Sequence, residues 1–235
     1  MTFSTRSPER LPRGDRKRAT VEAMFDRIAP RYDRMNRVIS LGQDVRWRRR
    51  AVATLDLQPA ARVLDLACGT GDLCRELGSA GYRPVGVDLS QGMLQEASTD
   101  APLVRADAER LPFRDATFDG VVCGFALRNF VELDAVFRAC ARALRPGGRL
   151  VALDAAVPER IVLRLGNTAW FRGAVPLIGR FFGRDAEAYR YLPRSTAYLP
   201  EPQTLLRRLA SAGFGTVQRT TMTGGSVQLL VGVRS

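Results

Sequence analysis

Histidine is absent from this chain of 235 residues, and lysine occurs once, at Lys17. The chain therefore lacks the side chain that most often serves as a general base near neutral pH and most often binds metals through nitrogen. Its cysteines are scattered and form no CxxC pair, so neither a zinc site nor a disulfide framework is expected. We predict no metal site. The cysteines are Cys68, Cys74, Cys123 and Cys140.

Long apolar runs are also missing. The best candidate, 161–182, is interrupted by Arg164, Arg172 and Arg180, whereas a membrane span needs about 18 uninterrupted apolar residues. The first residues, MTFSTRSPERLPRGDRKR, are polar and lack the apolar segment of a secretory signal. These absences predict a cytoplasmic protein, and a hydrophobic content of 46% predicts one domain with a sizeable core.

Acidic residues are too few to balance the basic ones, which leaves a formal net charge of +12. All but one of the 36 basic residues are arginines, a skew typical of a GC-rich genome. Codon bias and solubility explain this charge most simply, and an anionic membrane surface or an acidic ligand is the alternative. No recognised nucleic-acid motif is present, so no nucleic-acid partner is expected.

The pattern along the chain divides it into segments. Residues 1–18 are predicted to form a basic flexible tail, and 19–235 a single domain. Within that domain we expect N-terminal helices over 19–58, a cofactor-binding core over 61–154, and a helical cap inserted over 158–200.

Short apolar runs alternate with helix-like segments through the core: RVLDLA, PVGVDL, PLVRAD, FDGVVCGFA and GRLVALDA. Strands separated by helices predict an α/β fold with a doubly wound parallel sheet. Two final runs, FGTVQRT and GGSVQLLVGV, are predicted to pair as a hairpin. The expected sheet is thus mostly parallel and seven-stranded.

The stretch LDLACGTGD, residues 64–72, carries acidic side chains around a glycine turn. It is not a dinucleotide fingerprint, because Cys74 stands where the third glycine would be needed. Asp65 inside the first strand would repel a phosphate, so the turn indicates a ligand with cationic centres. A carboxylate that merely accepts backbone amides is the alternative interpretation of Asp65.

Two more carboxylates follow at the ends of the next strands. Asp88 ends the second strand, where α/β folds place an acceptor for ribose hydroxyls, although it could instead cap the following helix. Asp107 and the small Ala108 follow the third strand and could bind an adenine amino group and its ring plane. Together with Asp65 these residues predict a nucleoside site at one edge of the sheet.

This series resembles the class I S-adenosylmethionine-dependent methyltransferases over 61–154, which implies their Rossmann-like fold. The implied cofactor, S-adenosyl-L-methionine, carries a sulfonium and an ammonium and no phosphate, which suits an acidic site. The resemblance implies these cofactor-binding residues: Asp65, Gly69, Thr70, Gly71, Asp88, Leu89, Met93, Asp107, Ala108 and Gly124.

Two further stretches, YDRMNRVISLGQDVRW at 32–47 and FALRN at 125–129, are similar to signatures of the quinone-biosynthesis C-methyltransferases. Members of that family methylate demethylmenaquinol or a ubiquinol precursor. The chain departs from the family pattern at Asp44, where histidine is usual, at Gly124, where serine is usual, and at 154–156, where Glu-x-Ser is usual. The resemblance implies the same reaction, on demethylmenaquinol or a related quinol.

Methylation of a ring carbon requires an electron-rich ring, which a hydroquinone becomes when a hydroxyl loses its proton. A free phenol titrates near ~10, and a nearby guanidinium would stabilise the phenolate. We predict Arg128 for this role, Asn129 as an orienting donor, and Tyr32 as the residue that closes the site. Asp33, Asp154, a tyrosine, an ordered water and bulk solvent remain alternatives for proton removal.

The expected partner is therefore a small quinol or phenol. Segment 160–182 mixes large apolar side chains with periodic arginines, as in an interfacial helix, and predicts peripheral membrane contact. The alternative for this segment is core packing or a subunit contact in a homodimer. Two other functions stay open: methylation of another phenolic or specialised metabolite at carbon or oxygen, and a non-enzymatic role as a cofactor-binding regulator or a basic RNA-associated protein.

Overall fold

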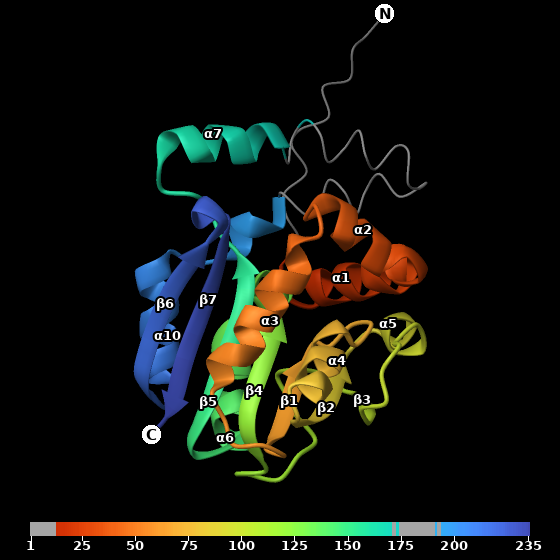
Figure 1. Ribbon diagram of the computed structural model, residues 1–235, viewed down its shortest axis with the longest axis vertical. Coiled ribbons are helices and arrows are strands. Elements are labelled where there is room, and N and C mark those ends of the chain that lie inside the picture. The colour runs from red at the N-terminus through yellow and green to blue at the C-terminus, as the bar shows by residue number, and fades with distance from the viewer. Residues whose placement is uncertain (1–12, 171–172, 174–190, 192–193) are drawn as a thin grey trace, which may run out of the picture.

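The structure is a computed structural model that describes residues 13–170, 173, 191 and 194–235 (Figure 1). Seven strands form one sheet in the order β3-β2-β1-β4-β5-β7-β6, parallel except for β7, which is antiparallel to both its neighbours. The predicted mostly parallel sheet and C-terminal hairpin are confirmed. The strands are β1 (Arg62–Leu66), β2 (Arg83–Asp88), β3 (Leu103–Arg105), β4 (Phe118–Gly124), β5 (Leu144–Ala155), β6 (Phe214–Met222) and β7 (Val227–Arg234).

The order of the strands decides where a ligand can bind. The chain runs outward from β1 to β2 and β3, then returns to β4 on the other side of β1. The connections that leave the carboxyl ends of β1 and β4 therefore diverge, and such a switch point leaves a crevice at that edge of the sheet.

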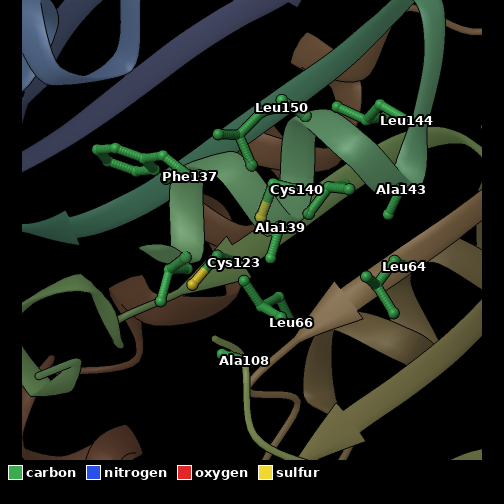
Figure 2. Close-up of a cluster of buried hydrophobic side chains, with 14 of the residues drawn as sticks. Leu64, Leu66, Ala108, Cys123, Phe137, Ala139, Cys140, Ala143, Leu144 and Leu150 are labelled. Atoms are coloured by element: carbon green, nitrogen blue, oxygen red, sulfur yellow. The ribbon is translucent and has the colours of Figure 1, made fainter. Parts of the chain in front are cut away.

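Helices α6 (Leu133–Ala143) and α10 (Pro202–Ser211) cover one face of the sheet. In Figure 2, Phe137 and Cys140 of α6 lie against Leu66 of β1, Cys123 of β4 and Leu150 of β5. All four cysteines are free and buried, and the described residues contain no cluster of side chains suited to a metal ion.

Helices α3 (Gln43–Leu55) and α4 (Asp72–Ser79) cover the opposite face. Leu55 of α3 and Leu77 of α4 are fully buried with Val63 of β1 and Val151 of β5. Val63 faces this layer, whereas Leu64 belongs to the other core, as the alternation of side chains along a strand requires.

The N-terminal helices differ from the expected pattern. Helix α1 (Gly14–Ile28) begins within the stretch predicted as a tail, so only 1–12 of that stretch lie outside the described residues. Pro30 turns the chain through a short 3-10 helix, η1 (Ala29–Arg31), into α2 (Tyr32–Ile39). Met24 and Ile28 of α1 pack with Met93 of α5 (Gln91–Gln95), which brings α1 to the crevice.

Parts of the predicted cap are described. Helix α7 (Ile161–Ala169) lies beyond the carboxyl end of β5, at the same end of the molecule as α1 and α2 (Figure 1). Three 3-10 helices lie near this end: η2 (Leu127–Asn129), η4 (Thr196–Tyr198) and η5 (Thr223–Gly225). Within the described ranges, no helix has the length and apolar character needed to cross a membrane.

Candidate active site

The glycine turn joins β1 to α4 and depends on left-handed backbone conformations. Gly69 has a φ of 55° and Gly71 a φ of 83°, which glycine adopts without the steric penalty of a Cβ atom. A Cβ atom on Gly71 would lie 2.8 Å from Cγ2 of Thr99, so the available space also requires glycine. The turn therefore presents backbone groups to the crevice.

Asp88, the last residue of β2, holds this turn in place. Its Oδ2 accepts a hydrogen bond from the Gly69 amide and its Oδ1 accepts one from the Ser90 amide, both at 2.8 Å. Burial raises the pKa of Asp88, and the hydrogen bonds from the Ser90 and Gly69 amides oppose that rise. Asp88 also lines the crevice, where a carboxylate oxygen can accept a further bond from a ligand hydroxyl.

The crevice contains a cavity with about 810 Å³ of empty space, its open mouth included, which we call the first cavity. Most residues predicted to bind the cofactor line it: Gly69, Asp88, Leu89, Met93, Asp107, Ala108 and Gly124.

Three residues predicted to bind the cofactor, Asp65, Thr70 and Gly71, are not in the cavity lining. Asp65 is fully buried, and its Oδ2 accepts a hydrogen bond from Cys74 Sγ at 3.3 Å. Its Oδ1 has no hydrogen-bond partner in the part of the chain that is described. Burial raises the pKa of Asp65 to about 7, with the Cys74 hydrogen bond opposing the rise.

Helix α1 lies across the first cavity, which the sequence analysis did not predict. Residues 18, 22 and 26 are spaced by four and share one face of the helix, a pattern that could have revealed the contact. Each pairs with a residue beside the cavity: Arg18 with Glu109 at 2.8 Å, Glu22 with Arg105 at 3.0 Å, and Asp26 with Ser90 at 2.5 Å.

Lys17 also anchors helix α1, through contacts with Phe130 and Tyr198. The side chain is 5% exposed, its Nζ donates to the Phe130 carbonyl oxygen at 2.6 Å, and Nζ lies 3.8 Å from the centroid of the Tyr198 ring. Burial lowers the pKa of Lys17 to about 8, while the Glu132 carboxylate opposes the decrease. The ammonium thus joins α1 to the chain that follows η2.

A second cavity adjoins the first. Phe25, Tyr32 and Phe125 line both, so these three side chains form the boundary between them. Most of the second cavity is lined by apolar side chains, among them Met24, Ile28, Met35, Ile39, Trp47, Val162, Leu163 and Trp170.

Tyr32, predicted to close the site, is one of the three residues at that boundary. Its ring comes within 4.0 Å of where a Cβ atom on Gly69 would lie, so it touches the glycine turn. Burial raises the pKa of Tyr32, and the Asn36 side chain and the charges of Arg48 and Arg128 oppose the rise. The hydroxyl is therefore neutral near pH 7.

Arg128 lines the second cavity but is not a free cation. Its Nη1 forms an ion pair with Asp154 Oδ1, and its Nε donates to Ser195 Oγ at 3.1 Å. Asp154 is fully buried, lines neither cavity, and also accepts bonds from the Arg128 and Ala155 amides. Among the described residues no acceptor pairs with Nη2 of Arg128.

Asn129 lines the first cavity and not the second. Its Oδ1 accepts a hydrogen bond from the Tyr191 hydroxyl at 3.0 Å, and burial raises the pKa of that tyrosine. Asp33, one candidate proton acceptor, instead accepts a hydrogen bond from Thr70 Oγ1 at 2.5 Å and lines neither cavity. Neither of the two carboxylates considered as bases therefore borders a cavity.

The charges around the first cavity fit the implied cofactor. Four carboxylates line it against one arginine, Arg18, which is itself paired with Glu109. Such a set of negatively charged acceptors suits a ligand with cationic centres and would repel a phosphate. Asp88, Asp107 and the glycine turn would hold the nucleoside and amino-acid parts of S-adenosyl-L-methionine.

The fold, the glycine turn and the acidic cavity define a class I S-adenosylmethionine-dependent methyltransferase. A solved methyltransferase of Thermotoga maritima, described as a possible histamine N-methyltransferase, has this fold with a TM-score of 0.64 at 17% identity, over 91% of this chain and 99% of that one. A phosphoethanolamine N-methyltransferase of Haemonchus contortus with bound S-adenosyl-L-methionine gives a TM-score of 0.59 at 17% identity, over 79% of this chain and 52% of that one.

The chain belongs to the ubiE/COQ5 methyltransferase family, whose family model matches residues 13–234. It is 42% identical to a demethylmenaquinone methyltransferase of Mycolicibacterium gilvum, over 89% of this chain and 92% of that protein. It is 38% identical to a demethylmenaquinone methyltransferase of Roseiflexus sp., over 95% and 97% of the two chains. The resemblance inferred from the sequence is confirmed.

Replacement of Asp65 by asparagine is expected to flatten the pH dependence of stability. The pKa of Asp65 in the folded chain lies above its ordinary value, so its contribution to the free energy of unfolding is complete below about pH 4 and is lost as the pH rises to about 7. The loss is at most about 4 kcal/mol. Denaturant unfolding between pH 5 and 8 measures it, and parallel curves for wild type and Asp65→Asn would contradict the prediction.

Replacement of Arg128 by alanine is expected to destabilise the fold as well as lower turnover. Asp154 would stay buried without its partner, at a cost of about 3–5 kcal/mol. The variant R128M/D154N removes both charges and should recover most of that stability while turnover stays at least about tenfold low. Calorimetry with S-adenosylhomocysteine should show unchanged affinity, because Arg128 does not line the first cavity. Wild-type turnover in the double variant would remove Arg128 from the chemistry.

Proposed function

We propose that the chain methylates a ring carbon of a reduced demethylmenaquinone. The observation that carries the proposal is the mainly apolar second cavity, which meets the acidic first cavity at Phe25, Tyr32 and Phe125. A flat aromatic acceptor in the second cavity would reach the cofactor only past these three rings. The names of the curated relatives favour a naphthoquinol over a benzoquinol, so a ubiquinol precursor is the second candidate.

When bound, S-adenosyl-L-methionine supplies an electrophilic methyl group and its own leaving group. The chain has three tasks: to hold the acceptor ring, to exclude water, and to favour the anionic form of a ring hydroxyl. The rings of Phe25, Tyr32 and Phe125 serve the first two tasks, because they confine the acceptor on apolar surface. The third falls to arginine, since a cation beside the hydroxyl lowers the pKa of a phenol.

The chain has no histidine to remove the proton of the ring hydroxyl. Asp154 is saturated by hydrogen bonds, and Asp33 is engaged by Thr70. Tyr32 borders the cavity, but burial raises the pKa of its hydroxyl, so it is a poor acceptor near neutral pH. We assign proton removal to water at the cavity, with the adjacent arginines making the loss favourable.

We propose that this methyltransferase is cytoplasmic and docks on the bilayer through an apolar rim around the second cavity. The six most exposed large apolar side chains of the described residues all lie at this end of the molecule: Leu41, Val157, Ile161, Val162, Leu163 and Leu165. Four of them also line the second cavity, so the rim is continuous with the place where the acceptor would bind.

Charge complementarity favours a bilayer as the occupant of this rim. Arg160 and Arg164 are exposed beside it, and the whole chain has a net charge of +12, which suits anionic headgroups. Trp170, which belongs to the 160–182 segment predicted to contact the membrane, lines the cavity and donates to the Ile39 carbonyl oxygen at 3.1 Å. Three further aromatic residues of that segment, Phe171, Phe181 and Phe182, lie outside the described residues.

The reaction is tested with purified protein, labelled cofactor and a panel of reduced naphthoquinols and benzoquinols. We expect label on a ring carbon of a naphthoquinol lacking one ring methyl group, located by fragmentation in a mass spectrometer. Label on a hydroxyl oxygen would show that the chain is an O-methyltransferase for phenols. Cofactor binding without transfer to any member of the panel would contradict the proposed reaction.

Docking is tested with the variant I161S/L165S, whose two side chains do not line the second cavity, and vesicles of mixed neutral and anionic lipids. We expect the wild type to sediment with the vesicles, and the variant to stay in solution while it still methylates a short-chain quinol. R50Q/R207Q serves as a control, because both arginines are exposed away from the rim. Equal recovery of wild type and rim variant would reject docking. If the wild type is a dimer in solution and the rim variant is a monomer, the rim binds a second copy of the chain instead of a bilayer.

A further inference from the structure

Five charged side chains of alternating sign run from α2 through α3 to the start of α4, and we call them the charge chain. The sequence analysis gave none of them a role. In order they are Arg37, Asp44, Arg48, Asp72 and Arg75.

Arg48 is the central member and is 6% exposed. Its Nη1 forms an ion pair with Asp44, and its Nη2 lies 2.8 Å from Asp72 Oδ2. Asp72 is the last residue of the LDLACGTGD stretch and begins α4. One guanidinium thus connects the wall of the second cavity, which Asp44 and Arg48 line, to the glycine turn of the first.

A second polar contact ties the same helices to the same turn. Asp33 of α2 accepts a hydrogen bond from Thr70 Oγ1 at 2.5 Å. The turn is therefore held at Thr70 by α2 and at Asp72 by α3. Tyr32, next to Asp33 in the chain, touches Gly69, the residue before Thr70.

The charge around Arg48 is incompletely neutralised. Arg128 faces one carboxylate of its own, Asp154, so that pair is neutral. Each carboxylate beside Arg48 is also shared with an outer arginine, Asp44 with Arg37 and Asp72 with Arg75. The charge chain therefore carries three positive and two negative charges. Of the three arginines in the charge chain, Arg48 alone lines the second cavity, so it provides the positive charge of this chain that lies nearest the acceptor.

Burial keeps this charge effective. A buried guanidinium that holds two carboxylates interacts with its neighbours through a less polarisable medium than water, so its field reaches further than that of a surface arginine. The guanidinium also holds its two carboxylates through a rigid planar fork, whereas the rotatable donors of an ammonium impose no such geometry. Arg48 thus combines an electrostatic and a geometric contribution.

We propose that Arg48 is a positioning residue for methyl transfer, which fixes Tyr32 against the glycine turn and favours the anionic form of the acceptor. The electrostatic part rests on the proposed function, because it requires a phenolic acceptor. The geometric part does not, because it concerns Tyr32 and the turn alone.

Two substitutions separate these contributions, and a neighbour supplies the control. R48K keeps the charge but lacks the rigid fork that spans Asp44 and Asp72, whereas R48M removes the charge. Arg49 also bridges α3 and α4, through Glu76 at 3.3 Å, but its side chain is 70% exposed, so R49M is the matched control. Turnover of a short-chain naphthoquinol is measured from pH 6 to 9 for each variant, together with the melting temperature.

R48K should lower kcat about tenfold without moving the pH at which activity rises. R48M should lower kcat further and move that rise about one unit higher, as expected when a cation near a phenol is lost. R49M should match the wild type in both. Unchanged kcat and pH profile in R48K and R48M would overturn the proposal, as would a loss of activity that only follows the fraction of unfolded protein.

A measurement made without any methyl acceptor tests the role of Arg48 separately from the proposed reaction. The protein is labelled with 3-fluorotyrosine, and the Tyr32 resonance is assigned by its loss in Y32F. We expect this resonance to titrate at higher pH in R48M than in wild type and R49M, since Arg48 opposes the raised pKa of Tyr32. An identical titration in R48M would overturn the proposal even if a quinol is methylated. A shifted titration without transfer to any quinol would reject the reaction alone.

Discussion

The carboxylate of Asp88 is the contact on which the rest of the site depends. It binds the Gly69 amide on one side and the Ser90 amide on the other, so one side chain fixes the glycine turn relative to α5. Asp26 of α1 then binds Ser90, which extends the same arrangement to the helix that covers the cavity. A buried carboxylate with several backbone donors is stabilised in place, because leaving those donors unpaired would be costly.

The sheet could be predicted because its signal is local. Runs such as RVLDLA and PVGVDL bury both faces, and the final hairpin follows from two neighbouring runs. The place of the hairpin in the sheet could not be read from those runs, because it depends on β7 pairing with β5 far away in the chain. The start of α1 was missed since a basic, proline-containing stretch lacks apolar periodicity, and its polar face is stabilised by partners on other elements.

The sequence predicted which residues border the site better than it predicted how those residues pair with one another. Asp88, Asp107 and Tyr32 border a cavity, because each follows or adjoins an element whose end the sequence reveals. Pairings between distant residues were not available, so the ion pair between Arg128 and Asp154 was not predicted. Arg48 was overlooked because one more arginine in an arginine-rich helix carries no local signal, and only burial distinguishes it.

The unique lysine of the chain has a practical consequence. Lys17 is enclosed between the Phe130 carbonyl group and the Tyr198 ring, and it lies on the helix that covers the first cavity. An acylating reagent can modify this amine only while that helix is lifted away from its neighbours. The rate of acylation at this one position therefore reports how often α1 separates from Phe130 and Tyr198.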